Sequence, residues 1–126
     1  MSIMGDSYVL VVEDDAAIRV SLCDALGDEG ISVRVATNGH EALEVLARCG
    51  PAAVVLLDLM MPVMDGEQFR RRQLADPALA DIPVVVMTAS HARCLKHLQL
   101  TAVLRKPFQL GHLVATLQPH LARKTS

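Results

Sequence analysis

The alternation of short apolar runs with longer, partly polar segments is the feature of this sequence that most limits its fold. Five runs have the length and the Val and Leu content of β-strands, and the segments between them carry apolar residues at helical spacing. Alternation of this kind is typical of a parallel sheet with helices on both faces. The sequence therefore predicts an α/β fold with a doubly wound, five-stranded parallel sheet.

The bounds of the expected elements follow from these runs and from the Gly and Pro residues between them. The strands are expected at 8–12, 32–36, 53–57, 83–87 and 101–104. The first, third and fourth are almost continuously apolar, so we expect them at the centre of the sheet. The helices are expected at 16–29, 40–49, 67–75 and 111–122, with a weaker candidate at 91–98. Pro119 is expected to kink or shorten the last helix.

Length and composition limit the class of protein. The chain has 126 residues, and we expect 1–126 to form a single domain with its core at about 8–120. The net charge of -2 gives no electrostatic footprint for nucleic acid or for an anionic membrane. No apolar stretch approaches the roughly 18 residues of a membrane span. The three cysteines form no C-x-x-C pair, which favours reduced thiols and a cytoplasmic location.

Acidic and polar residues follow four of the predicted strands directly. They are Glu13, Asp14 and Asp15 after the first strand, Asp58 after the third, Thr88 after the fourth and Lys106 after the fifth. Ligand sites of open parallel sheets lie outside these carboxyl ends of the strands. Clustered carboxylates repel one another unless a divalent cation and a lysine offset their charge, and an oxygen-only site suits Mg²⁺ or Mn²⁺.

Four short motifs contain these residues and occur in order along the chain. They are Val11-Val12-Glu13-Asp14-Asp15, Leu57-Asp58-Leu59-Met60-Met61-Pro62-Val63-Met64-Asp65-Gly66, Val86-Met87-Thr88-Ala89 and Arg105-Lys106-Pro107-Phe108. In these motifs and their spacing the chain resembles the receiver domains of two-component response regulators, the CheY-like family. The resemblance runs from Tyr8 to about His120. It implies a flavodoxin-like order of strands.

The resemblance implies a role for each of the residues at the strand ends. Asp58 is the expected phosphoacceptor, with Thr88 hydrogen-bonded to one phosphoryl oxygen and Lys106 paired with another. The Lys106–Pro107 peptide bond is expected to be cis, as in the family. The expected cofactor is Mg²⁺, and its expected ligands are Asp14, Asp58, the backbone carbonyl of Met60 and, through water, Glu13.

Partners and a mode of action are also implied by the resemblance. The donor is expected to be a phosphohistidine on a sensor histidine kinase or a phosphotransfer protein. The phosphorylated domain is expected to present a changed protein-binding surface to an unknown downstream protein. Because such a domain assists only its own phosphorylation and dephosphorylation, we do not expect an enzyme that acts on a separate substrate. We also expect no direct binding to nucleic acid or membrane.

Two features depart from the family pattern. From Thr88 to Lys106 is 18 residues, fewer than the family commonly has, which predicts a shortened fourth-helix region. Val103 stands where the family usually has Tyr or Phe, so the family's aromatic switch cannot be carried over. We therefore expect signalling to use reordering of residues 89–93.

Other interpretations of these residues stay open at this point. A pseudo-receiver that is never phosphorylated would act as a constitutive protein-binding module. A flavodoxin-like FMN carrier would need a hydroxyl- and glycine-rich loop after the first strand, where this chain has acids that repel phosphate. A phosphohydrolase with an aspartyl-phosphate intermediate would carry a second acid two residues after Asp58. Taken alone, Glu13 and Asp14 would be helix caps, although Asp15 suits that role better.

Overall fold

The computed structural model describes residues 7–59, 63–89 and 98–121 of the chain. Within these residues the elements, in chain order, are β1 (Val9–Val12), α1 (Ala16–Asp28), β2 (Val33–Ala36), α2 (Gly39–Cys49), β3 (Val54–Asp58), α3 (Gly66–Leu74), β4 (Val84–Thr88), β5 (Ala102–Arg105) and α4 (Leu110–Leu121). The five expected strands and the four main expected helices are confirmed, with bounds shifted by one residue at most. The candidate helix at 91–98 and the shortened region around it fall almost wholly outside the described residues and stay predictions.

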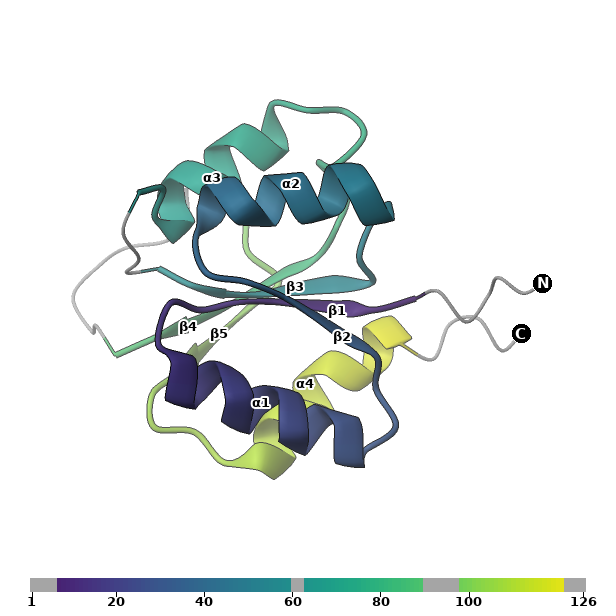
Figure 1. Cartoon of the computed structure of the whole chain (residues 1–126), viewed down its shortest axis with the longest axis vertical. Coiled ribbons are helices and arrows are strands. Elements are labelled where there is room, and N and C mark those ends of the chain that lie inside the picture. The colour runs from purple at the N-terminus through teal and green to yellow at the C-terminus, as the bar shows by residue number, and fades with distance from the viewer. Residues whose placement is uncertain (1–6, 60–62, 90–97, 122–126) are drawn as a thin grey trace.

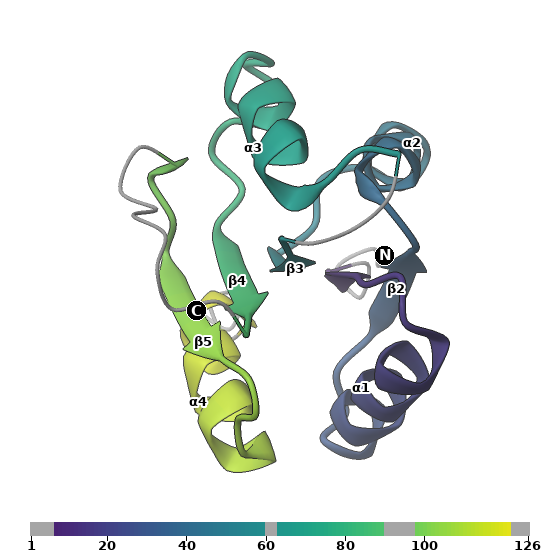
Figure 2. The same cartoon turned by 90° about the vertical axis from the view of Figure 1, so that its left-hand side faces the viewer.

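The five strands form one parallel sheet in the order β2-β1-β3-β4-β5. The three apolar strands β1, β3 and β4 are central, as expected. Helices α2 and α3 cover one face of the sheet, and α1 and α4 cover the other (Figure 1). The connections turn in opposite directions from the adjacent pair β1 and β3, and such a switch point opens a crevice at the carboxyl ends of the strands. Figure 2 looks onto that edge of the sheet.

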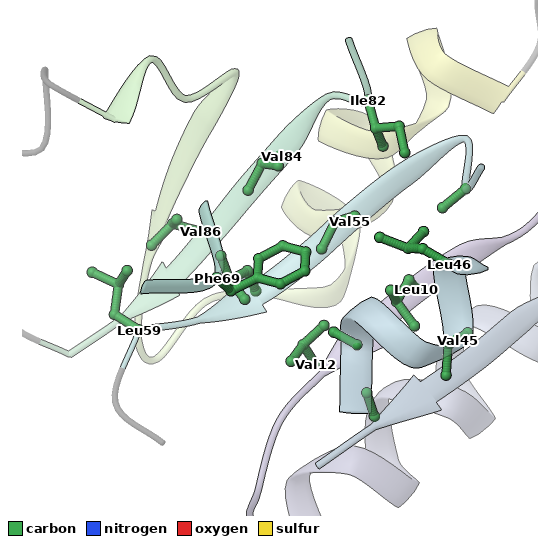
Figure 3. Packing of buried hydrophobic residues seen from close by; sticks show 14 of the residues in the cluster. Leu10, Val12, Val45, Leu46, Val55, Leu59, Phe69, Ile82, Val84 and Val86 are labelled. Carbon is green, nitrogen blue, oxygen red and sulfur yellow. The ribbon is translucent and has the colours of Figure 1, made fainter. Parts of the chain in front are cut away.

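Alternate side chains of the central strands enter two separate cores. On the face of α2 and α3, Leu10, Val55 and Val84 pack with Phe69 (Figure 3). On the opposite face, residues one position further along the strands pack against α1 and α4. This second core contains Val9, Val11, Val54, Leu56, Val85, Met87, Leu22, Leu26, Leu104, Leu113 and Leu117. Full burial of such side chains stabilises the fold by about 1.5–3 kcal/mol each, so the strand ends are held on a rigid platform.

Polar caps fix the starts of three helices. The Asp15 carboxylate accepts a hydrogen bond from the Ile18 N–H at the start of α1, which confirms Asp15 as the cap of that helix. Asn38 caps α2 in the same way. Asp65 and Gln68 form a reciprocal capping box at the start of α3. Because Asp15 fills the capping role, Glu13 and Asp14 are available for other contacts.

The last helix ends at the edge of the sheet opposite to the carboxyl ends of the strands. β1 begins at that same edge (Figure 1). α4 continues through Pro119 to Leu121, so the helix is not shortened at the proline, and the alternative expectation of a kink stays a prediction. A proline removes only one N–H donor, and in the last turn of a helix few hydrogen bonds depend on it. Among the ranges described here, no helix is both long and apolar enough to cross a membrane.

Candidate functional site

Three carboxylates meet where β1 and β3 end. Glu13 and Asp14 directly follow β1, and Asp58 is the last residue of β3. One carboxylate oxygen from each lies within 4.8 Å of the other two. Glu13 and Asp58 are buried, with residue exposures of 1% and 6%, whereas Asp14 is exposed to solvent. The predicted acidic residues are therefore brought together into one pocket, with one acid facing outward.

Lys106 reaches this pocket from the far side of β4. Its Nζ lies 3.2 Å from Glu13 Oε1 and 3.7 Å from Asp58 Oδ2. The backbone N–H of Lys106 donates to the Thr88 carbonyl at 2.9 Å, which ties the ends of β4 and β5 together. The Lys106–Pro107 bond is cis, as expected. One ammonium group thus contacts two of the three carboxylates.

Thr88 is the last residue of β4 and is buried. The preceding residue, Met87, pairs with Asp58 in the sheet register. Parallel pairing therefore places Thr88 at the same edge as Asp58, one strand away. Of the expected site residues, Met60 lies outside the described part of the chain, so its predicted role as a ligand stays a prediction.

The electrostatics of the pocket centre on Glu13. Burial and a hydrogen bond with the Asp58 carboxylate raise the pKa of Glu13 to about 7, although the Asp15 N–H and the charge of Lys106 act in the opposite direction. At neutral pH, Glu13 therefore carries a proton for part of the time. The raised pKa shows that the pocket disfavours a further negative charge beside Asp58. A bound cation would offset this charge, as the proton does.

Arg19 orients the acidic loop by contacting its backbone. Arg19 Nη1 donates to the Glu13 carbonyl at 2.9 Å and makes a longer contact of 3.4 Å with the Asp14 carbonyl. The Asp15 N–H donates to Glu13 Oε2 at 3.2 Å. The sequence motifs assign no role to Arg19. Its position one turn after the Asp15 cap is the signal that places its side chain back over the loop.

A glycine brings α3 directly against the acceptor strand. The Gly66 N–H donates to the Leu59 carbonyl at 3.0 Å. A Cβ atom on Gly66 would lie 2.6 Å from the Asp58 carbonyl oxygen and 2.8 Å from Leu59 Cα. Asp65-Gly66 begins a helix, as the sequence predicts, but the close approach to Asp58 was not predictable from a common turn dipeptide.

The donor atoms of the pocket fit a small hard cation. All three side chains offer carboxylate oxygens, and two of them are held in place by the β1 and β3 ends of a rigid sheet. Mg²⁺ prefers oxygen ligands and is bound in proteins through one or two carboxylates together with water. A mixture of buried and exposed acids suits this arrangement, because the exposed Asp14 leaves one side of the pocket accessible to water.

An apolar groove lies beside the pocket. It has a volume of about 630 Å³ and lies between α1 and the segment that joins β5 to α4. Its apolar lining includes Ile18, Leu22, Pro107 and Phe108, and Lys106 forms the side nearest to the carboxylates. Lys106 therefore belongs both to the groove and to the acidic pocket.

Comparison with known proteins places this arrangement in a family. The model of the response regulator receiver domain matches residues 9–118. This chain belongs to the response regulator receiver domain family. The assignment confirms the resemblance seen in the four motifs and leaves the FMN-carrier and phosphohydrolase alternatives without support. It makes the chain a receiver domain of two-component systems.

Relatives of this receiver domain share both sequence and fold. The response regulator MprA of Mycolicibacterium vanbaalenii is 41% identical over 123 residues, which cover 93% of this chain and 51% of MprA. MprA of Mycobacterium leprae is 40% identical over 121 residues, which cover 91% of this chain and 51% of that protein. The chain thus spans about half the length of these curated relatives.

Solved receiver structures superpose closely on the domain. The chemotaxis protein CheY4 of Vibrio cholerae has a TM-score of 0.83 at 30% identity, covering 91% of this chain and 98% of CheY4. The receiver domain of the sensor histidine kinase PA1611 from Pseudomonas aeruginosa has a TM-score of 0.81 at 26% identity, and the match covers 90% of this chain and 95% of that domain. That second structure contains a magnesium ion coordinated in its active-site cleft. The CheY-like, flavodoxin-type fold predicted from the sequence is confirmed.

Proposed function

We propose that this receiver domain accepts a phosphoryl group on Asp58 from a phosphohistidine, assisted by Thr88, Lys106 and Mg²⁺. The observation that supports this most directly is the convergence of three carboxylates with Lys106, whose Nζ lies 3.7 Å from Asp58 Oδ2. A buried carboxylate is a weak nucleophile, and it requires neighbouring positive charge to react with an anionic phosphoryl group.

In the proposed reaction, an Asp58 carboxylate oxygen attacks phosphorus while the bond from phosphorus to the donor imidazole nitrogen breaks. The imidazole leaves with its electron pair, and an acyl phosphate forms on Asp58. Lys106 moves from its contacts with the carboxylates to pair with a transferred oxygen, and the Thr88 hydroxyl donates to another. When bound by Asp14, Asp58, the Met60 carbonyl and, through water, Glu13, Mg²⁺ supplies further positive charge to the phosphoryl oxygens.

Loss of the phosphoryl group follows the same geometry. Water attacks phosphorus opposite to the Asp58 oxygen, inorganic phosphate leaves, and the carboxylate is restored. The domain is changed and then restored by its own reaction, and no separate substrate is consumed. We therefore propose a phosphorylated signalling domain and not an enzyme in the ordinary sense. Manganese, which the sequence also allowed, stays a prediction.

The groove beside Lys106 supports a protein donor. A sensor histidine kinase or phosphotransfer protein must bring its phosphohistidine to Asp58, and the exposed surface next to that residue includes this groove. Its apolar lining offers area for a docked helix, because apolar burial is the main favourable term in such contacts. We propose that the donor docks there, and that the phosphorylated domain then contacts an unknown downstream protein in the cytoplasm.

Intact-mass measurement tests the acceptor. Treatment of the domain with acetyl phosphate and Mg²⁺ should add one phosphoryl group, which is absent in Asp58→Asn and after addition of EDTA. Asp76→Asn is a matched control, because Asp76 is exposed and lies outside the acidic pocket, and it should still accept the group. A folded wild-type domain that gains no phosphoryl group under any of these conditions would instead support a constitutive protein-binding module.

A further inference from the structure

Helix α3 turns two polar side chains toward the interior. Arg70 is 5% exposed and Gln73 is fully buried, on the same side of the helix as Phe69. Arginine is rarely buried to this degree unless its donors are paired, because desolvation of the guanidinium is costly. The neighbouring Arg71 is exposed and pairs with Glu67, four residues earlier on the helix surface. The two adjacent arginines therefore have different roles.

The buried guanidinium holds the chain just before β5. Arg70 Nε donates to the Leu98 carbonyl at 2.8 Å, and Nη2 donates to the Gln99 carbonyl at 2.7 Å. Gln99 has a positive φ of 54°, a conformation uncommon for residues with a side chain. Two charge-assisted hydrogen bonds to consecutive carbonyls keep this turn in place.

Gln73 fixes the guanidinium from within α3. Arg70 Nη1 donates to Gln73 Oε1 at 2.8 Å, and Gln73 Nε2 donates to the carbonyls of Leu79 and Ile82. The network therefore joins α3 to the segment before β4 and to the segment before β5. These are the two strands whose ends carry Thr88 and Lys106.

β5 has little of its own that sets its register. It is one of the two edge strands of the sheet, and of its four residues, all of which the structure describes, Leu104 alone is buried. The register of a strand is weakly specified where its buried pattern is short. The Thr101 N–H donates to the Val84 carbonyl directly after the turn at Gln99, so the turn decides where pairing with β4 begins.

We propose that Arg70 is a positioning residue for Lys106. By holding the carbonyls of Leu98 and Gln99 against α3, it sets the register in which β5 delivers Lys106 to Asp58. This inference rests on the proposed function for the role of Lys106 in phosphoryl transfer. The acidic residues lie at the ends of β1 and β3, and these two strands pair with each other without contact from this clamp.

The test compares Arg70→Met and Arg70→Lys with the surface control Arg71→Met. Three quantities are measured: amide hydrogen exchange at Thr101 and Lys106, the Mg²⁺ dissociation constant by calorimetry, and the rate of phosphorylation by acetyl phosphate. The Glu13 amide, which donates to the Ala36 carbonyl on the other side of the sheet, is the internal reference for exchange.

Arg70→Met should increase exchange at Thr101 and Lys106 relative to Glu13 and slow phosphorylation by about tenfold, with Mg²⁺ affinity within about twofold of wild type. Arg70→Lys, which keeps one donor group, should give values between those of Arg70→Met and the wild type. If Arg70→Met does not fold, Arg70→Lys is the variant that tests whether Arg70 sets the register of β5. The proposal is overturned if either variant behaves as Arg71→Met does, or if Mg²⁺ affinity and all amides change together. If the wild type accepts no phosphoryl group, the proposed function fails, while the exchange measurements still decide whether Arg70 sets the register.

Discussion

The protonation of Glu13 depends strongly on the residues around it. It is buried between Asp58 and Lys106, and its pKa is raised to about 7 chiefly by burial. A carboxyl group whose pKa is higher in the folded state than in the unfolded state binds more protons when folded. Its contribution to stability is present below its ordinary pKa and is lost as the pH rises through about 7.

We expect this group to make the metal-free domain less stable at pH 8 than at pH 5, by about 1–3 kcal/mol. Urea unfolding in EDTA at the two pH values measures the difference. Mg²⁺ at pH 8 should restore stability, because a cation bound by the three carboxylates offsets the same repulsion.

Glu13→Gln is the control for this pH dependence, because its side chain does not titrate. The difference in the free energy of unfolding between pH 5 and pH 8 should be smaller in this variant than in the wild type. An unchanged difference would mean that another group is responsible.

Among the helices, α3 makes a close backbone contact with the end of β3, the strand that carries Asp58. Its first residue, Gly66, abuts the Asp58 backbone, and Arg70, one turn later, holds the chain before β5. The same helix therefore contacts both the strand that carries Asp58 and the segment that leads to Lys106.

Gly66→Ala should destabilise the domain by about 1–3 kcal/mol, because the added Cβ meets backbone atoms that cannot rotate away. It should also slow phosphorylation by acetyl phosphate, since relief of the clash displaces the backbone of Asp58. Urea unfolding and intact-mass time courses measure the two effects.

Gly111→Ala is the matched control in α4. Its added Cβ would meet no atom within 4 Å, and alanine is favoured over glycine in helices by about 0.5–1 kcal/mol. Equal stability losses in the two variants would contradict the steric explanation.

The elements themselves were predictable from the sequence, but their contacts were less so. The central strands are continuous apolar runs, and Asp15 and Asp65 are placed by their position before helices, so local patterns specify them. The pocket was predictable because the carboxyl ends of parallel strands share one edge.

The buried role of Arg70 was hidden in the sequence. It stands in a run of three arginines that reads as a solvated helix surface. Which of the three faces inward depends on the carbonyls of Leu98 and Gln99, which are 28 and 29 residues away in sequence. The positive φ of Val63, a β-branched residue, was likewise not predictable from the preference of that residue type.

At the scale of the whole molecule, the groove between α1 and the β5–α4 segment is expected to matter for one kind of phosphoryl donor and not for another. A small donor such as acetyl phosphate needs only the pocket, whereas a protein donor also has to cover the surface beside it.

The donor in this test is a phosphorylated histidine phosphotransfer domain that transfers its phosphoryl group to the wild type. We expect Ile18→Lys to reduce the rate of this transfer by about tenfold or more, because the lysine places a charge in an apolar contact. Reaction with acetyl phosphate should change little. The ratio of the two rates, measured by intact mass, reports docking alone.

Val20→Lys is the control for this prediction, since Val20 lies on the same helix, is 57% exposed and is not part of the groove lining. Equal effects of the two lysines on transfer would argue for a general charge effect on the donor and against the groove.

The end of α4, at the edge of the sheet away from the pocket, has a consequence for how the domain can be attached. Anything joined beyond Leu121 starts from the edge of the sheet away from the acidic pocket. The proposed site of phosphorylation and the point of covalent attachment thus lie at opposite edges of the sheet.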